Sequence, residues 1–235
     1  MSPKDYSLPE PKSRIFNAAA ALFVNKGFEA VGVREIAKEA KVNIAMINYY
    51  FGGKVGILKA ILDEAYQKYH QAQASAGDDS TPPEQRARNL VTNVVRFFRD
   101  NTEIALVTFN TMLFDIPEIL SLREKWAQMN FAVMGGFFSQ IGVDLKDPVH
   151  NSVYNGFLGN MIKSHFQIRY FVDRMPAVVT GENGPENTET NFNDKFSFDD
   201  DFYDRYIDLL VHQYFHGVIY ATQNDKMKHN RGENK

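Results

Sequence analysis

The strongest constraint on the fold comes from residues 33–51, where two short apolar repeats of helical period are separated by a tight turn. The first repeat, Val33 to Ala40, spaces its small and branched side chains so that they share one helix face. The second, Ile44 to Phe51, follows Asn43, a residue type that often caps a helix N-terminus. Two helices joined so closely form a helix-turn-helix, whose second helix can enter the major groove of DNA.

Caps and glycines mark further helices on both sides of this unit. After a polar tail at residues 1–11, the apolar pattern predicts a helix that Ser13 caps and Gly27 ends. Gly52-Gly53 separates the second short helix from a longer one that starts near Lys54. These four helices predict one small helical unit at the start of the chain.

The rest of the chain is also helical by pattern, because alternating strand-like patterns are almost absent. The segment at residues 75–83 predicts a linker between two domains. Polar residues 176–198 predict a long exposed loop, and charged residues 224–235 predict a tail. The expected class is all-α with about nine helices. Beyond the linker, the expected helices cover residues 84–100, 103–114, 117–141, 148–174 and 199–223.

Composition and charge narrow the class of function. Hydrophobic residues make up 44% of the chain, which is enough for a packed core, and no stretch reaches the roughly 20 apolar residues of a membrane helix. The first residues contain no apolar signal-peptide run, so we expect a cytoplasmic protein with no membrane partner. Residues 1–70 carry a net charge of +3 and the remainder −6. A mildly basic first part is consistent with contact to phosphate at one end.

Enzyme chemistry has little support in the sequence. The absence of cysteine excludes disulfides, thiolate metal sites and a cysteine nucleophile, and no GxSxG, Walker or GxGxxG motif is present. His212 and His216 have a spacing at which metal ligands can share a helix face, but no acidic partner or HExxH arrangement accompanies them. We therefore expect no enzyme activity, no metal and no cofactor. His165, in an aromatic helix, is interpreted as a packed histidine.

An ordered series of residue types runs from Ser13 to Tyr66. A helix ends in leucine-phenylalanine, and a glycine, an isoleucine-alanine pair, the turn and an aromatic cluster ending in phenylalanine follow. The series ends with a small residue followed directly by lysine, and then with a leucine a few residues later. In this chain it reads Ala21-Leu22-Phe23, Gly27-Phe28, Glu35-Ile36-Ala37, Val42-Asn43, Tyr49-Tyr50-Phe51, Gly53-Lys54 and Ile57-Leu58.

This series resembles the N-terminal part of the TetR family of transcriptional regulators and covers about the first third of the chain. The resemblance implies a helix-turn-helix DNA-binding domain at residues 12–74. It also implies a larger helical-bundle domain for ligand binding and dimerisation at residues 84–223. The expected protein is a homodimer that binds double-stranded DNA at a palindromic operator, most often as a repressor, and that a small-molecule effector releases.

Three positions depart from the family pattern. Gly32 stands where a threonine often caps the second helix. Lys41 stands where the turn usually has glycine, so it is expected to need a left-handed backbone conformation. Asn48 replaces a tyrosine that many members have in the recognition helix. These departures leave the fold intact but affect which DNA is read, so base specificity does not transfer.

Chemistry and the matched positions predict how this unit contacts DNA. Asn48 can pair with adenine, and the short or apolar side chains that open the helix can read shape and thymine methyl groups. Tyr49 and Lys54 are the strongest expected phosphate contacts. The predicted DNA-binding residues are Arg34, Asn43, Ile44, Ala45, Met46, Asn48, Tyr49, Tyr50 and Lys54.

For three of these residues a structural role is the alternative. Asn43 could act only as a cap, Tyr50 only in core packing, and Arg34 only as a solvated charge. Lys12 and Arg14, near the start of the first helix, are further candidates for contact with the DNA backbone or the minor groove.

Aromatic and methionine side chains run through the body at helical spacing. Such a stripe is more often core than pocket, but it is where an apolar effector would bind. By the resemblance, the aromatic helices at 148–174 and 199–223 build a four-helix dimer interface, with ordinary intramolecular core as the alternative. The candidate pocket residues are Phe97, Phe109, Met112, Phe114, Trp126, Met129, Phe137 and Phe138.

The sequence leaves three functions open. The first is a ligand-responsive regulator of the TetR type. The second is a helix-turn-helix architectural or division-associated DNA binder with no small-molecule site, which a buried cavity in the body would argue against. The third is an all-helical enzyme, which requires converging acid, base or metal groups that the sequence does not reveal.

Overall fold

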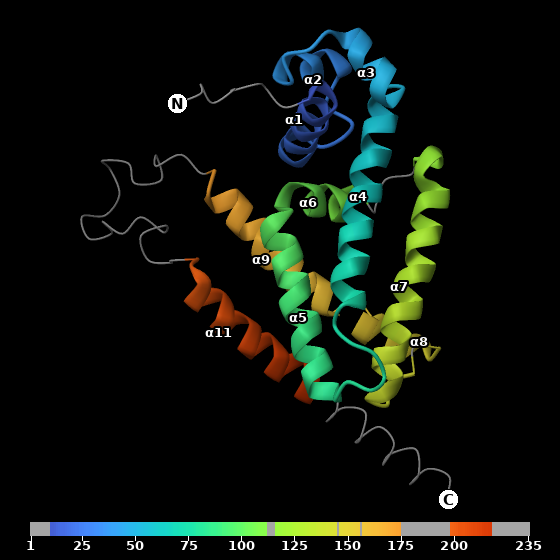
Figure 1. Ribbon diagram of the computed structural model, residues 1–235, viewed down its shortest axis with the longest axis vertical. Coiled ribbons are helices and arrows are strands. Elements are labelled where there is room, and N and C mark those ends of the chain that lie inside the picture. Colours follow the sequence, from blue (N-terminus) through green and yellow to red (C-terminus); the bar gives the residue numbers. More distant parts are fainter. Residues whose placement is uncertain (1–9, 112–115, 145, 156, 175–197, 218–235) are drawn as a thin grey trace, which may run out of the picture. The chain divides into compact units, whose positions relative to one another are not determined.

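The computed structural model describes residues 10–111, 116–144, 146–155, 157–174 and 198–217 (Figure 1). The regular elements in these ranges are all helical, which confirms the all-α class. The chain forms two compact units. The first comprises Met1–Lys68 and Glu103–Ala127, and the second comprises Tyr69–Thr102 and Gln128–Lys235.

The first unit is built around three short N-terminal helices that pack against one another, drawn in blue in Figure 1. Each contributes a fully buried isoleucine to their common core, namely Ile15, Ile36 and Ile47. The elements of this unit are α1 (Pro11–Lys26), α2 (Val33–Glu39), α3 (Ile44–Phe51), the first part of α4 (Lys54–Ala74), α6 (Thr102–Asn110), the 3₁₀ helix η2 (Pro117–Ile119) and the start of α7 (Leu120–Gln140).

The ends of α1 show why the sequence stops and starts this helix where it does. Gly27 ends α1 with a positive φ of 81°, and its N–H donates to the Phe23 carbonyl at 3.0 Å. The prediction that Ser13 caps the helix is wrong, because α1 begins at Pro11, after Glu10. A proline lacks the N–H that would be unpaired at the first helical position, and its fixed φ suits that position. The expected tail at residues 1–11 was therefore one residue too long, because Pro11 already belongs to α1.

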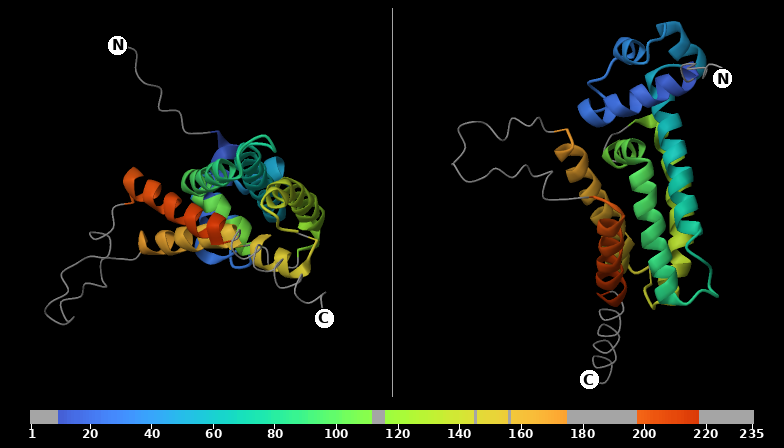
Figure 2. Two further views of the ribbon diagram at one scale, coloured as in Figure 1. Left: turned by 90° about the horizontal axis from the view of Figure 1, so that it is seen from below. Right: turned by 60° about the vertical axis from the view of Figure 1, so that its left-hand side comes forward.

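The second unit contains the longer helices of the body. Residues 75–82 connect α4 to α5 inside this unit, and the domain bounds 12–74 and 84–223 stay a prediction. Figure 2 shows α5, α9 and α11 together, and α5 contacts both of the others. The elements are the ends of α4 and α7, α5 (Pro83–Asp100), α8 (Pro148–His150), the π-helix η3 (Asn151–Asn155), α9 (Phe157–Val172), α11 (Asp200–Val211) and the π-helix η5 (His212–His216).

Aromatic stacking and ion pairs hold α5 against α9 and α11. Phe98 on α5 is fully buried and stacks on Phe166 of α9, with ring centroids 5.5 Å apart. At the surface, Arg99 pairs with Asp200 at 2.7 Å, which joins α5 to the first turn of α11. Because this ion pair is exposed, the apolar contact contributes most of the stability.

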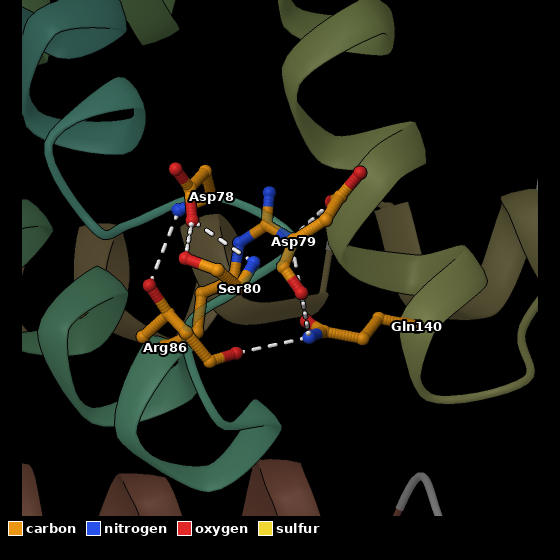
Figure 3. Close-up of polar contacts among 6 residues, drawn as sticks. Asp78, Asp79, Ser80, Arg86 and Gln140 are labelled. Carbon is orange, nitrogen blue, oxygen red and sulfur yellow. Dashed lines mark hydrogen bonds and ion pairs between the residues drawn. The ribbon is translucent and has the colours of Figure 1, made fainter.

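A buried arginine fixes the connection between α4 and α5 (Figure 3). Arg86 donates from Nη1 to Asp79 at 3.0 Å and to the Gln140 side chain at 3.2 Å. Gln140, at the end of α7, donates in turn to the main-chain carbonyl of Thr81 at 2.9 Å. Asp78 accepts from the main chain and hydroxyl of Ser80, and these hydrogen bonds lower the pKa of its carboxyl. The connection is thus tied to α5 by the charge-assisted Arg86–Asp79 pair and to α7 by the hydrogen bond from Gln140 to Thr81.

Several expectations for the body need correction or lie outside the described residues. The single helix expected at 148–174 is divided into α8, η3 and α9. Phe198, expected in an exposed loop, is half-buried against His165 with ring centroids 5.8 Å apart. The remaining loop at 176–197, the tail at 224–235 and most of the N-terminal tail lie outside the described residues.

His165 lies among aromatic side chains of α9 and α11, and the Tyr206 ring centroid is 4.7 Å away. Burial, followed by the charge of Arg169, lowers the pKa of His165 to about 4. The unfolded chain binds this proton at a pH of about 6.5. The free energy of unfolding is therefore expected to fall as the pH decreases from about 6.5 to about 4, by on the order of 1 kcal/mol after discounting for solvent screening.

Urea unfolding of the native chain and of His165→Gln at several pH values tests this expectation. The variant should show a weaker dependence of stability on pH across this window, because glutamine does not titrate there. Identical pH profiles for the two proteins would show that His165 is not responsible.

Candidate nucleic-acid interface

α3 buries one face and exposes the other. Ile47 is fully buried and anchors the helix, whereas Asn48 is exposed and Tyr49 is 82% exposed. Ile44 and Ala45 are also exposed, at the N-terminal end. The outer surface of α3 therefore presents an amide, a phenol and small apolar groups without any formal charge. Such groups suit contact with base edges and thymine methyl groups.

The turn before α3 has the backbone conformation that the sequence predicted. Lys41 has a φ of 53°, in the left-handed region, and the N–H of Val42 donates to the Ala37 carbonyl at 3.0 Å. The amide oxygen of Asn43 accepts from the N–H of Ala45 at 2.9 Å, which confirms Asn43 as the N-cap. Because the cap uses the oxygen, the NH₂ group is the part of Asn43 suited to donate to phosphate.

Arg14 contacts this turn from α1. Its Nη1 donates to the main-chain carbonyl of Lys41 at 3.4 Å. The sequence suggested Arg14 only as a contact to DNA, because 27 residues separate it from Lys41 and no local pattern links them. In the folded chain, Arg14 supports the strained turn residue that precedes the exposed helix.

Lys54, at the start of α4, is held by main-chain acceptors of its own domain. Its Nζ donates to the Phe28 carbonyl at 3.0 Å and to the Glu29 carbonyl at 3.5 Å. The same nitrogen lies 4.2 Å from the centre of the Phe28 ring. Lys54 thus joins α4 to the segment between α1 and α2. Its expected phosphate contact stays a prediction, and any phosphate has to share this amine with the two carbonyls.

Replacing Lys54 by methionine is expected to lower the free energy of unfolding by about 1–2 kcal/mol. The change keeps most of the apolar stem but removes the charged donor and the cation–π contact. Denaturant unfolding measures the effect, with Lys59→Met, at an exposed position on the same helix, as the control. Equal stability of the two variants would show that the Lys54 contacts add nothing to the fold.

Three glycines shape the junction between α3 and α4. Gly52 and Gly53 have positive φ values of 70° and 116°, and open space surrounds the position of a Cβ at each. At Gly56 the reason for glycine is different. A Cβ there would lie 1.6 Å from the main-chain oxygen of Phe51. The end of α3 therefore approaches α4 as closely as only a glycine at position 56 permits.

The remaining predicted DNA-binding residues lie on or beside this surface. Arg34, on α2, is exposed, and Met46 is half-buried. Tyr50 is half-buried and meets Tyr49 edge to face, with ring centroids 5.0 Å apart. A packing role for Tyr50 and a contact with DNA are both compatible with this position.

The candidate pocket residues are divided between the two units. Phe109 and Trp126 belong to the first unit, where Trp126 stacks on Tyr66 and donates to Asp63 at 3.3 Å. Phe97, Met129, Phe137 and Phe138 belong to the second unit, and Met112 and Phe114 lie outside the described residues. Phe97, Trp126, Phe137 and Phe138 are all buried, so each of these four contributes to a packed interior.

Among the residues that the structure describes, no helix combines the length and apolar character that crossing a membrane requires. Over the same ranges, no group of three or more His, Cys, Asp or Glu side chains is arranged to hold a metal ion.

Comparison with known proteins gives a family match for the interface described above. Residues 15–61 match the model of bacterial regulatory proteins of the tetR family. The chain is 33% identical over 123 residues to a "probable HTH-type transcriptional regulator YttP" of Bacillus subtilis, a match that covers 49% of this chain and 59% of the relative. It is 31% identical over 96 residues to the HTH-type transcriptional repressor NicS of Pseudomonas putida, covering 41% of this chain and 45% of the relative. The chain thus matches about half the length of these curated relatives.

A solved structure extends the likeness beyond the N-terminal helices. The fold is similar to that of the TetR family transcriptional regulator PfmR from Thermus thermophilus, with a TM-score of 0.51. The sequences are 23% identical, and the match covers 70% of this chain and 88% of PfmR. At this identity the comparison supports the fold alone. Residues 15–61 therefore form an N-terminal segment of the kind found in bacterial regulatory proteins of the tetR family.

Proposed function

We propose that this chain is a sequence-specific DNA-binding transcriptional regulator that inserts α3 into the major groove. The observation that carries the proposal is the outer face of α3, where Asn48 and Tyr49 are exposed while Ile47 is buried beneath them. Asn48 is suited to pair with adenine, and Ile44 and Ala45 are suited to contact thymine methyl groups. Tyr49, Asn43 and Arg34 are suited to bind the phosphate backbone.

The regulator acts as a homodimer on a palindromic operator. Support for the dimer comes from α9 and α11, two helices of the second unit that expose large apolar side chains to solvent. Ile168 and Phe171 on α9 are each 61% exposed, and Leu209 on α11 is 57% exposed. Burying such side chains against a second copy removes apolar surface from water. Two copies of α3 related by a two-fold axis then meet half-sites one helical turn apart.

The dimer represses transcription and is released by a small, apolar effector. NicS, one of the relatives, is named a repressor, which favours this direction of control. The aromatic character of the body favours an apolar ligand. An architectural DNA binder without an effector is the second candidate, since the outer face of α3 supports DNA binding in either case.

A selection from random DNA sequences, followed by binding measurements over a salt series, tests the DNA-binding proposal. The native chain should select one motif and lose affinity steeply with salt. Asn48→Ala should reduce discrimination at one base pair by about 1–3 kcal/mol, whereas Tyr49→Ala should weaken binding to all sequences alike. Asn17→Ala, at an exposed position on α1, is the matched control. Equal binding to all sequences, unchanged in both α3 variants, would overturn the proposal.

The dimer is tested separately by placing charges on α9. Ile168→Asp combined with Phe171→Asp should yield a monomer in sedimentation experiments. Its affinity for the full operator should fall by about a hundredfold, because the two half-sites are no longer bound by one particle. Leu120→Asp, at an exposed apolar position on α7, is the control. A double variant that stays dimeric would show that α9 is not the interface.

A further inference from the structure

The segment after α11 holds two histidines in an uncommon helical geometry. α11 continues into the five-residue π-helix η5, which begins at His212 and ends at His216. In this turn, as in an α-helix, residues four apart lie on the same helix face. The centroids of the two imidazole rings are 4.9 Å apart, and both side chains are exposed.

The distance between the rings suits a shared metal ion. An imidazole nitrogen lies about 2.0–2.1 Å from a bound zinc ion, so two rings that share one ion at neighbouring coordination positions have centroids roughly 4.5–5.5 Å apart. Phe215 is buried and meets the edge of the His216 ring, with centroids 5.4 Å apart. This contact restricts His216 before any ion binds, which reduces the entropy lost on binding.

We propose that His212 and His216 form a two-nitrogen chelate for a divalent transition-metal ion of the Cu²⁺, Ni²⁺ or Zn²⁺ type. The two histidines supply two ligands, and water molecules fill the remaining coordination positions of the ion. Imidazole is a good ligand for these ions, and Cu²⁺ binds most tightly in this series. The spacing in the sequence alone did not favour this site. The close approach of the two rings in the folded chain, which the spacing does not reveal, makes the difference.

Titration of the full-length, tag-free chain with Cu²⁺ tests the proposal, with calorimetry for affinity and electron paramagnetic resonance for the number of coordinating nitrogens. One ion per chain with a two-nitrogen spectrum is expected. His212→Asn and His216→Asn should each weaken binding by about a hundredfold, because a chelate that loses one arm also loses the effective concentration of that arm. Circular dichroism of each variant confirms that the helices are retained.

Two matched controls keep the result specific to this pair. His150→Asn, on α8, and His229→Asn, outside the described residues, should leave Cu²⁺ affinity unchanged. Unchanged binding in either His212→Asn or His216→Asn would overturn the proposal. So would a spectrum with four nitrogens and one ion for two chains, because a second copy would then replace the water ligands. None of these readouts depends on DNA binding, so they stand apart from the proposed regulatory function.

Discussion

Gly56→Ala is expected to lower the free energy of unfolding of the N-terminal helices by about 3 kcal/mol or more, because it overpacks a site with no room to relax. The new methyl group would meet the main-chain oxygen of Phe51 at 1.6 Å and its carbonyl carbon at 2.8 Å. Both atoms belong to the backbone at the end of α3, so no side-chain rotation can relieve the clash. α3 must move away from α4, and the exposed face that we assign to DNA moves with it.

Gly52→Ala provides the matched control for this prediction. Gly52 also lies in the α3–α4 junction, but open space surrounds its Cβ position. Alanine there is strained only by the φ of 70°, at a cost of about 1–2 kcal/mol. Thermal and urea unfolding should rank the native chain above Gly52→Ala and Gly52→Ala above Gly56→Ala, and DNA binding should follow the same order. Equal losses for the two variants would show that the structure relieves the clash at Gly56 at little cost and would contradict this prediction.

Phe98→Ala is expected to destabilise the second unit by about 3–5 kcal/mol, the usual cost of removing a fully buried phenylalanine. The Phe98 ring stacks on Phe166 and meets the edge of Phe97, with centroids 5.5 and 5.4 Å away. Alanine leaves a cavity between α5 and α9, because these helices are also held by other contacts and cannot close fully over it.

Phe131→Ala makes the same chemical change at a position that is 40% exposed on α7. Its cost should be well below that of Phe98→Ala, since little buried surface is lost. The two variants are compared by urea unfolding followed by circular dichroism. A loss at Phe131 as large as that at Phe98 would show that the Phe98–Phe166 stack is not a centre of stability.

The sequence predicted the helix-turn-helix better than the body for a physical reason. In the first part, α3 begins and ends as expected, because Asn43 and Gly52 act on adjacent backbone groups. In the body, the pattern at 148–174 suggested one helix where the structure has three elements. Apolar periodicity continues through a π-turn almost as it does through an α-helix, so the break is hard to see in the sequence.

For the candidate interface, residue type and spacing predicted which groups α3 exposes. They did not predict the contacts that hold the neighbouring residues in place. Asn48 and Tyr49 lie on the exposed face, as a helical repeat anchored by Ile47 requires. Lys54 was expected, together with Tyr49, as one of the strongest phosphate contacts, and the structure also gives its amine two main-chain acceptors 25 and 26 residues away. Only the folded chain brings such distant groups together.

The sequence by itself determined the all-α class and the cap at Asn43, because these follow from periodicity and local propensity. The left-handed backbone at Lys41 was expected from the resemblance, which has glycine at that position of the turn. The tertiary structure decided the close approach of Gly56 to the end of α3 and the pairing of His212 with His216. Local rules act between near neighbours along the chain. The packing of one helix on another, and the winding of a helix under that packing, depend on surfaces that form only when the chain has folded.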